Sequence, residues 1–266
     1  MRAIGRTFEI WRPPMALRNR ARRAVERMSG LSIYRRGPRG LKLYTDLASI
    51  PAPPLRTVFD VGAHRGESAA EFSRVWKSAI LHCFEPTRES FDALQARFAT
   101  SPQVNCYRLA LGDREYEGTL FVRSGSVNNS LRNYEGSVEQ ETLIGEEQVT
   151  VRTLDRFCAD FDIRHIDFLK VDTEGADLEV LAGAERLLAR GAVGVVQVEV
   201  GLDPDNTKHV SFESCKSKLE KFGYRLFGIY EQVREFPTGR WHLRRCNAVF
   251  ISQELSSASA PDASPH

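Results

Sequence analysis

The segment "TVFDVGAHRG", residues 57–66, places an acid and two glycines where a strand-like run turns into a helix-like run. Asp60 comes just before the turn, which carries Gly62 and Gly66. Glycine lets the backbone approach a ligand closely, and the free N–H groups that begin a helix attract a carboxylate. The G-x-x-x-G spacing differs from the G-x-G-x-x-G of dinucleotide sites, and an acid here would repel a pyrophosphate but attract an ammonium group. The turn favours a ligand with an amino-acid end; ordinary turn chemistry is the alternative.

Two later acids suit the remainder of such a ligand. Glu85 ends the run "LHCFE", where its carboxylate can accept hydrogen bonds from two ribose hydroxyls. The alternative is a surface acid before a helix that starts at Pro86. Asp113, in "LALGD", is placed to reach an adenine amino group, or else is a turn residue after a glycine. S-adenosylmethionine combines an amine, a carboxylate and a nucleoside, and it therefore fits better than NAD.

Three acids follow later apolar runs and are candidates for catalysis. Asp172 ends "DFLKVD" and is the first choice for a general base, with a helix N-cap as the alternative. Glu174 follows it, although a first-turn acid also suits the helix dipole. Glu199 ends "VVQVEV", and a charge after an apolar strand needs a partner or a site. His64 and His209 are further candidates, with a solvated loop position expected for His209. The three acids also form a candidate Mg²⁺ site, and the metal requirement stays open.

Strand-like and helix-like runs alternate after residue 56, which predicts an α/β fold with a doubly wound, mostly parallel sheet. Several strands are apolar on both faces, as helices on both sides of a sheet require. The last two strands are too close in sequence for a crossover helix and should pair antiparallel. In such a sheet the ligand binds beyond the carboxyl ends of the strands, where these acids would meet. The main expected strands are 57–61, 79–85, 104–111, 166–172 and 192–200.

The N-terminal region differs in charge from the rest of the chain. Residues 1–42 carry twelve basic and two acidic side chains, whereas the remainder has a net charge of −8. We therefore expect a basic, partly helical arm over 1–50, a globular unit over 51–252 and a disordered polar tail over 253–266. A solvated arm and an arm that lies on an anionic membrane both fit this composition. No nucleic acid partner is expected, because no aromatic residues are interleaved with the arginines.

The cysteines and the hydropathy pattern bear on the cellular compartment. Five scattered cysteines without a CxxC pair argue against a disulfide framework or a zinc site. No apolar run approaches the roughly 18–20 residues of a membrane span, and the N-terminus has no apolar signal core. The sequence predicts a cytoplasmic protein, with contact at the membrane surface through the arm as the open alternative. The oligomeric state is not predicted.

Taken together, the motifs from about residue 55 to 251 resemble the FkbM family of S-adenosylmethionine-dependent methyltransferases. The resemblance implies a seven-stranded, Rossmann-like class I methyltransferase domain over 51–252, which methylates an oxygen, often a sugar hydroxyl. The long block after residue 165 is the most specific part. The motifs, in order, are "FDVGAHRG", "CFEP", "ALGD", "VTVRTLDRF", "IDFLKVDTEGADLEVLAGA", "VQVEVG" and "GYRLFGIY" with "CNAVFI".

The resemblance also assigns roles by position. It places Asp60, Gly62 and Gly66 in the cofactor loop, where His64 replaces an asparagine that is common in the family. It assigns Glu85 to the ribose. It puts three residues on the reacting face: Asp172, Thr173 and Glu174.

Substrate contacts are expected in the polar segment 123–148, which is too long for an ordinary hairpin turn. Its hydroxyl and amide side chains, with Tyr134 to stack on a sugar ring, suit a carbohydrate lid, and a surface loop is the alternative. The resemblance favours three of its residues as contacts: Asn128, Asn129 and Ser130.

The resemblance thus implies an O-methyltransferase that acts on a sugar hydroxyl of a glycan or a glycosylated metabolite. The alternatives are a non-catalytic binding protein with the same fold and an NAD-dependent oxidoreductase.

Overall fold

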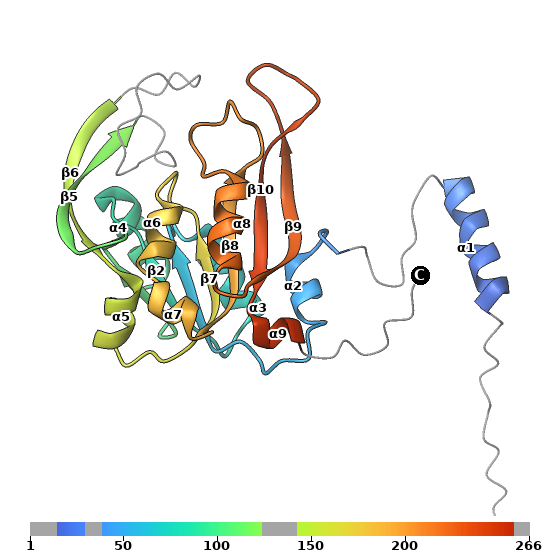
Figure 1. Cartoon of the computed structure of the whole chain (residues 1–266), viewed down its shortest axis with the longest axis horizontal. Helices are drawn as coiled ribbons and strands as arrows, with labels where there is room; N and C mark the ends of the chain where they lie inside the picture. Colours follow the sequence, from blue (N-terminus) through green and yellow to red (C-terminus); the bar gives the residue numbers. More distant parts are fainter. Residues whose placement is uncertain (1–14, 30–38, 124–142, 258–266) are drawn as a thin grey trace, which may run out of the picture. The chain divides into compact units, whose positions relative to one another are not determined.

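The computed structural model describes residues 15–29, 39–123 and 143–257 (Figure 1). The chain divides into two units, Met1–Pro38 and Arg39–His266. The first unit contributes one described helix, α1 (Met15–Ser29). None of the helices in these ranges is both long and apolar enough to cross a membrane. The expected substrate residues Asn128, Asn129, Ser130 and Tyr134 lie outside the described residues.

A seven-stranded sheet forms the centre of the second unit, in the order β3-β2-β1-β7-β8-β10-β9. β1, β2, β3, β7 and β8 are mutually parallel, whereas β10 pairs antiparallel with β8 and β9. This confirms the predicted fold class, including the antiparallel last pair. The strands are β1 (Thr57–Val61), β2 (Ile80–Phe84), β3 (Val104–Tyr107), β7 (Ile166–Val171), β8 (Val193–Gly201), β9 (Arg225–Arg234) and β10 (Leu243–Ile251).

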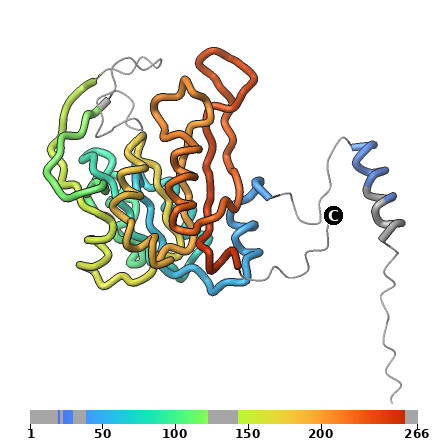
Figure 2. Tube along the Cα trace, viewed as in Figure 1, coloured from blue at the N-terminus to red at the C-terminus, as the bar shows by residue number. Residues whose placement is uncertain are grey.

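Helices cover both faces of this sheet, and each face has its own apolar core. Successive strand residues point to opposite faces, so Val58 joins one core and Phe59 the other. Val58 packs with α3 (Glu67–Val75) and α4 (Arg88–Arg97). The opposite core contains α5 (Leu154–Asp160), α6 (Asp177–Ala182), α7 (Glu185–Ala189) and α8 (Phe212–Glu220). Figure 2 traces this path through the layers.

A smaller sheet of three strands stands beside the main one, in the order β4-β6-β5. It consists of β4 (Ala110–Leu111), β5 (Tyr116–Arg123) and β6 (Leu143–Arg152). The run 104–111, expected as one strand, is therefore two strands in different sheets. Leu111 and Leu120, from this small sheet, form part of the pocket wall described below.

The ends of the globular unit differ from the expected boundaries. α2 (Leu43–Leu47) packs on α3, with the Tyr44 ring 5.3 Å from the Trp76 ring, and the Tyr230 hydroxyl donates to Asp46 at 2.9 Å. Residues 39–50 therefore belong to the globular unit, which begins at Arg39 rather than at residue 51. At the other end, Gln253–Ser257 form helix α9, so the expected tail begins later than residue 253.

Candidate functional site

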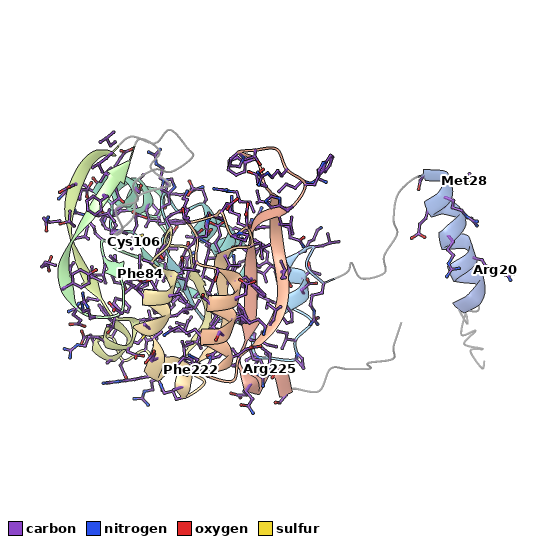
Figure 3. All side chains as sticks on the ribbon, turned by 45° about the horizontal axis from the view of Figure 1, so that its top comes forward. Arg20, Met28, Phe84, Cys106, Phe222 and Arg225 are labelled. Atoms are coloured by element: carbon purple, nitrogen blue, oxygen red, sulfur yellow. The ribbon has the colours of Figure 1, made fainter. Side chains whose placement is uncertain are left out.

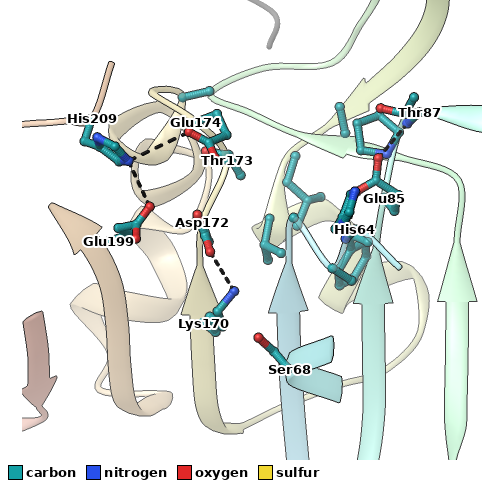
Figure 4. A pocket seen from close by; sticks show the side chains of 18 of the residues that line it. His64, Ser68, Glu85, Thr87, Lys170, Asp172, Thr173, Glu174, Glu199 and His209 are labelled. Carbon is teal, nitrogen blue, oxygen red and sulfur yellow. Dashed lines mark hydrogen bonds and ion pairs between the residues drawn. The ribbon is translucent and has the colours of Figure 1, made fainter. Parts of the chain in front are cut away.

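A pocket of about 520 Å³ opens at the carboxyl ends of β1, β2, β7 and β8. Parallel strands converge at this edge, which is the ordinary ligand position in a doubly wound sheet. Glu85, Asp172, Glu174 and Glu199 all line the pocket, as Figure 4 shows for their side chains. The topology thus brings together acids that are up to 114 positions apart in sequence.

The turn after β1 is held against the neighbouring strands. The N–H groups of Gly62 and Ala63 both donate to the Phe84 carbonyl at 3.0 Å. Gly62 has φ +81°, and a Cβ there would lie 1.8 Å from the Asp172 carbonyl oxygen. Glycine is therefore required at this position by the end of β7. Gly66, with φ +83°, precedes the first residue of α3 and is not part of the pocket wall.

Gly62→Ala should lower the free energy of unfolding by roughly 2 kcal/mol or more, because a left-handed backbone costs a side chain about 1–3 kcal/mol and β7 must also move. Chemical denaturation measures this loss. Gly145→Ala is the matched control, since a Cβ at Gly145 meets no described residue within 4 Å. Equal denaturation midpoints for the two variants would contradict the account of Gly62.

Glu85 joins the turn to the end of β2. Its side chain accepts hydrogen bonds from the N–H groups of His64 and Thr87, each at 2.9 Å. Glu85 is 6% exposed, and burial raises the pKa of its carboxyl above the usual value, against the effect of these hydrogen bonds. Beside it lies an apolar wall formed by Leu109, Leu111 and others. A carboxylate next to an apolar slot provides polar and apolar contacts for a nucleoside.

Asp60 lies beneath the pocket, not in its wall. It is fully buried, its nearest charged partner is Lys170 at 3.6 Å, and neither of its oxygens has a hydrogen-bond partner within the described part of the chain. Burial raises the pKa of Asp60 to about 6, although Lys170 acts in the opposite direction. The position of Asp60 outside the pocket wall therefore does not support its expected contact with a ligand ammonium. Asp172, which lines the pocket, is the acid available to such a group.

Lys170 is a buried cation that the sequence analysis overlooked. Its ammonium lies 2.9 Å from Asp172 and 3.6 Å from Asp60. Burial would lower the pKa of Lys170, but the two carboxylates raise it above the usual value. Burial likewise would raise the pKa of Asp172, but Lys170 holds it below the usual value. Asp172 is thus a weak base, so the expectation that it is the first choice for the general base is corrected. The sign of this buried cation in the sequence was a lysine inside the apolar run "DFLKV".

Lys170→Met should destabilise the fold by about 3–5 kcal/mol, because it leaves buried carboxylates without their cation. Denaturant unfolding measures the loss, and adding Asp60→Asn should recover part of it. Lys216→Met removes a surface ion pair with Glu220 and should cost less than about 1 kcal/mol. A Lys170→Met protein as stable as the Lys216→Met protein would contradict this role.

The opposite end of the pocket contains an imidazole between two carboxylates. His209 Nε2 lies 2.9 Å from Glu199 and 3.8 Å from Glu174. Each carboxylate also has a cationic partner, Lys208 at 3.3 Å for Glu174 and Arg245 for Glu199. The His209 side chain is 6% exposed, so the expected solvated position is wrong. Nothing in the local sequence "NTKHV" signalled this burial.

The tautomer of His209 follows from Asn206. The Asn206 amide nitrogen donates to the Arg244 carbonyl at 3.2 Å, which turns its oxygen towards His209 Nδ1 at 3.0 Å. Nδ1 must therefore carry a hydrogen, and the 2.9 Å contact between Nε2 and the Glu199 carboxylate must contain a second proton, on either Nε2 or Glu199. Burial lowers the pKa of His209. Burial and the negative charge of Asp172 raise the pKa of Glu174 to about 7. The site can therefore accept one proton near neutral pH.

Glu174 has a strained backbone. Its φ of +52° lies in the left-handed region that side chains rarely adopt, and Gly175 follows with φ +102°. Such strain costs about 1–3 kcal/mol and persists where the surrounding structure enforces it, commonly at functional sites. Here it carries the Glu174 carboxylate to within reach of His209.

The expected magnesium site is only partly assembled. Ligand atoms of Glu174, Glu199 and His209 lie within 4.8 Å of one another, whereas Asp172 pairs with Lys170. Magnesium prefers oxygen ligands, and the carboxylates already have cationic partners. This donor set does not fit Mg²⁺, and no step below uses a metal.

Three further expected residues need a placement. Asp113 is exposed and does not line the pocket, because β4 leaves the main sheet to pair with β6. The expected contact of Asp113 with adenine is therefore not supported by its position. His64 and Thr173 both line the pocket, and His64 Nδ1 is 3.5 Å from Glu67.

Comparison with known proteins gives a family and two methyltransferase relatives. A model described as "Methyltransferase FkbM domain" matches residues 60–226. The 2-O-methyltransferase NoeI of Sinorhizobium fredii is 24% identical over 160 residues, 56% of this chain and 66% of that protein. The hexuronic acid methyltransferase AglP of Haloferax volcanii is 29% identical over 170 residues, 62% of this chain and 65% of that protein. The chain thus spans just under two thirds of the length of either relative.

Similar solved structures include a TehB-like S-adenosylmethionine-dependent methyltransferase from Corynebacterium glutamicum. It has 14% identity and a TM-score of 0.36, with 90% of this chain and 100% of that chain covered. The methyltransferase domain of a bacterial Hen1 has 13% identity and a TM-score of 0.42, with 78% and 95% covered. We draw no argument from TM-scores this low.

Proposed function

Because this chain belongs to the FkbM family of methyltransferases, we propose that it is an S-adenosylmethionine-dependent O-methyltransferase of a sugar hydroxyl. The acceptor would be a glycan or a glycosylated metabolite. The observation that carries the proposal is one pocket with Glu85 and an apolar slot at one end and His209 with Glu199 at the other. The name of the hexuronic acid methyltransferase supports a sugar as acceptor, and that of the 2-O-methyltransferase supports transfer to an oxygen.

The residues at the first end fit the cofactor. Glu85 would take the ribose hydroxyls, and the apolar wall at Leu109 and Leu111 would take the purine. The turn at Gly62 and the carboxylate of Asp172 would hold the amino-acid end, in place of Asp60. When bound, S-adenosylmethionine supplies an electrophilic methyl group.

The residues at the second end fit the acceptor. Once the proton between Nε2 and Glu199 has been lost, a hydroxyl placed beside Nε2 can pass its proton to the nitrogen lone pair, and Asn206 holds the ring for this. Glu199 would stabilise the resulting imidazolium, while Arg245 and Lys208 balance the carboxylates. A general base contributes about 10²–10⁴-fold, whereas holding the reactants in line contributes roughly 7–11 kcal/mol. Positioning by the pocket is therefore the larger part of the catalysis.

A transfer assay tests the proposal. The protein is incubated with methyl-labelled S-adenosylmethionine and glycans from cells without the gene, and NMR locates any new O-methyl group. We expect a methyl ether on a sugar carbon. Cofactor binding without transfer to any glycan or metabolite fraction would favour the non-catalytic binding protein. Membership in a methyltransferase family already argues against the NAD-dependent oxidoreductase.

Location and membrane contact stay predictions. In α1, Arg20, Arg23 and Arg27 are exposed, and so are Val25 and Met28. This combination suits contact with an anionic membrane surface by a protein of the cytoplasm.

A further inference from the structure

Two aromatic side chains are exposed in the loop after β9, and one of them lines the pocket. They belong to the loop 235–242 between β9 and β10, visible as the extended hairpin in Figure 1. Trp241 is 87% exposed and Phe236 is 58% exposed, and Phe236 is part of the pocket wall. Large exposed apolar side chains next to a pocket commonly mark a contact surface. A sugar ring has apolar C–H faces that pack on such rings.

The loop that carries these rings is internally braced. The buried carboxylate of Glu235 accepts hydrogen bonds from Thr238 N at 2.8 Å, Thr238 Oγ1 at 2.7 Å and Arg240 N at 2.9 Å. His242 Nε2 lies 2.7 Å from Asp203 Oδ2, which fixes the loop to the segment before α8. Because these contacts hold the backbone, the exposed rings present a preorganised surface.

A guanidinium accompanies each ring. Arg234 lies 5.7 Å from the centre of Trp241, and Arg244 lies 5.3 Å from the centre of Phe236. Arg244 also lines the pocket. Stacking on an aromatic face holds the guanidinium in place, and its N–H edge can then donate hydrogen bonds to a carboxylate or a phosphate.

Arg244 differs from the other cations at this end of the pocket. Lys208 and Arg245 pair with Glu174 and Glu199, but no acid in the described ranges forms an ion pair with Arg244. The charge of Arg244 acts on Asp203, but the Asp203 carboxylate already interacts with the His242 ring and accepts a hydrogen bond from the Asp205 N–H. The acceptor end of the pocket therefore carries a positive charge that a ligand can neutralise.

We propose that the acceptor is an anionic sugar whose carboxylate or phosphate binds Arg244 and whose ring packs on Phe236 and Trp241. The inference rests on the proposed function and adds the charge of the substrate to it. Arginine matches both anions with two parallel hydrogen bonds, so the two sources share one chemistry. A neutral sugar would leave the guanidinium uncompensated next to the pocket.

The test uses the full chain and glycans from cells without the gene, split by anion exchange into neutral and acidic fractions. With methyl-labelled S-adenosylmethionine, label should enter the acidic fraction. Reduction of carboxyl groups should abolish labelling if the anion is a uronate, and phosphatase should abolish it if the anion is a phosphate. Label mainly in the neutral fraction, or label that survives both treatments, would overturn the inference.

Amino-acid substitutions test which residues recognise the acidic acceptor. Arg244→Gln should raise the KM for the labelled acidic acceptor by about 10- to 100-fold, the worth of a charge-assisted hydrogen bond, with cofactor affinity unchanged. Trp241→Ala should raise it by about 10-fold. The control is Arg225→Gln, at the opposite end of β9 from the loop, as Figure 3 shows. Equal KM values for Arg244→Gln and Arg225→Gln would overturn the inference. No transfer to any fraction, with cofactor binding intact, would instead overturn the proposed function.

Discussion

His209→Gln should lower kcat by roughly 10²- to 10⁴-fold, the usual contribution of a general base, while leaving the affinity for S-adenosylhomocysteine unchanged. The reason is geometric: Asn206 fixes a hydrogen on Nδ1, so Nε2, beside Glu199, is the ring atom that can take up the hydroxyl proton once this contact has lost its own proton. Glutamine can keep a hydrogen bond to Asn206 but cannot take up a proton. Steady-state kinetics and calorimetry separate the two effects.

The pH profile makes this prediction sharper. The base acts only when unprotonated, so the rate should fall as the pH drops and protons occupy the His209–Glu174–Glu199 cluster. Burial lowers the pKa of His209, whereas burial and the Asp172 charge raise that of Glu174 to about 7. The acid limb therefore belongs to the cluster rather than to one residue. His209→Gln should flatten it.

A matched histidine controls for general effects. His165→Gln changes a half-exposed histidine whose neighbour is Asp167 at 3.5 Å, outside the pocket wall. It should leave kcat and the profile unchanged. A His209→Gln enzyme with the same kcat as His165→Gln, or with an intact acid limb, would assign the proton transfer to another group.

Glu85→Ala should weaken the binding of S-adenosylhomocysteine by about 100-fold or more. Two hydrogen bonds from ribose hydroxyls to a carboxylate are each worth about 1.5–3 kcal/mol. The substitution also deprives the N–H groups of His64 and Thr87 of their acceptor, which loosens the turn that forms the pocket floor. Calorimetry measures the affinity, and circular dichroism shows whether the protein remains folded.

Glu89→Ala is the control for Glu85→Ala. Glu89 is an exposed acid four residues later, paired with Arg65 and outside the pocket wall. Its removal should leave the affinity within about twofold, because surface ion pairs contribute little. Tight binding by folded Glu85→Ala protein would remove the ribose assignment.

The fold and the position of Glu85 at the edge of the sheet followed from local patterns. Apolar runs such as 193–200 are buried on both faces, so hydrophobicity and periodicity identified them as strands. Glu85 was recognisable because it ends such a run, and parallel topology then brings it to the common edge. Gly62 was singled out for the approach of a ligand, whereas its observed close contact with Asp172 is tertiary and left no mark in the sequence.

The acceptor end depended on contacts between distant segments. Asp172 was preferred as base until the structure paired it with Lys170, since side chains two positions apart on a strand share one face. His209 appeared to be an ordinary loop residue, because Asn206 and Glu199 bury it only in the folded chain. Arg244 lies outside all of the motifs identified in the sequence. Its importance comes from the rings beside it.

Calorimetric titration with S-adenosylhomocysteine tests the central claim most directly. The unsubstituted protein and His209→Gln should each bind one equivalent with similar affinity, and Glu85→Ala should show little or no heat under the same conditions. Absence of heat from folded unsubstituted protein, or undiminished heat from Glu85→Ala, would contradict the assignment of this pocket to the methyl donor.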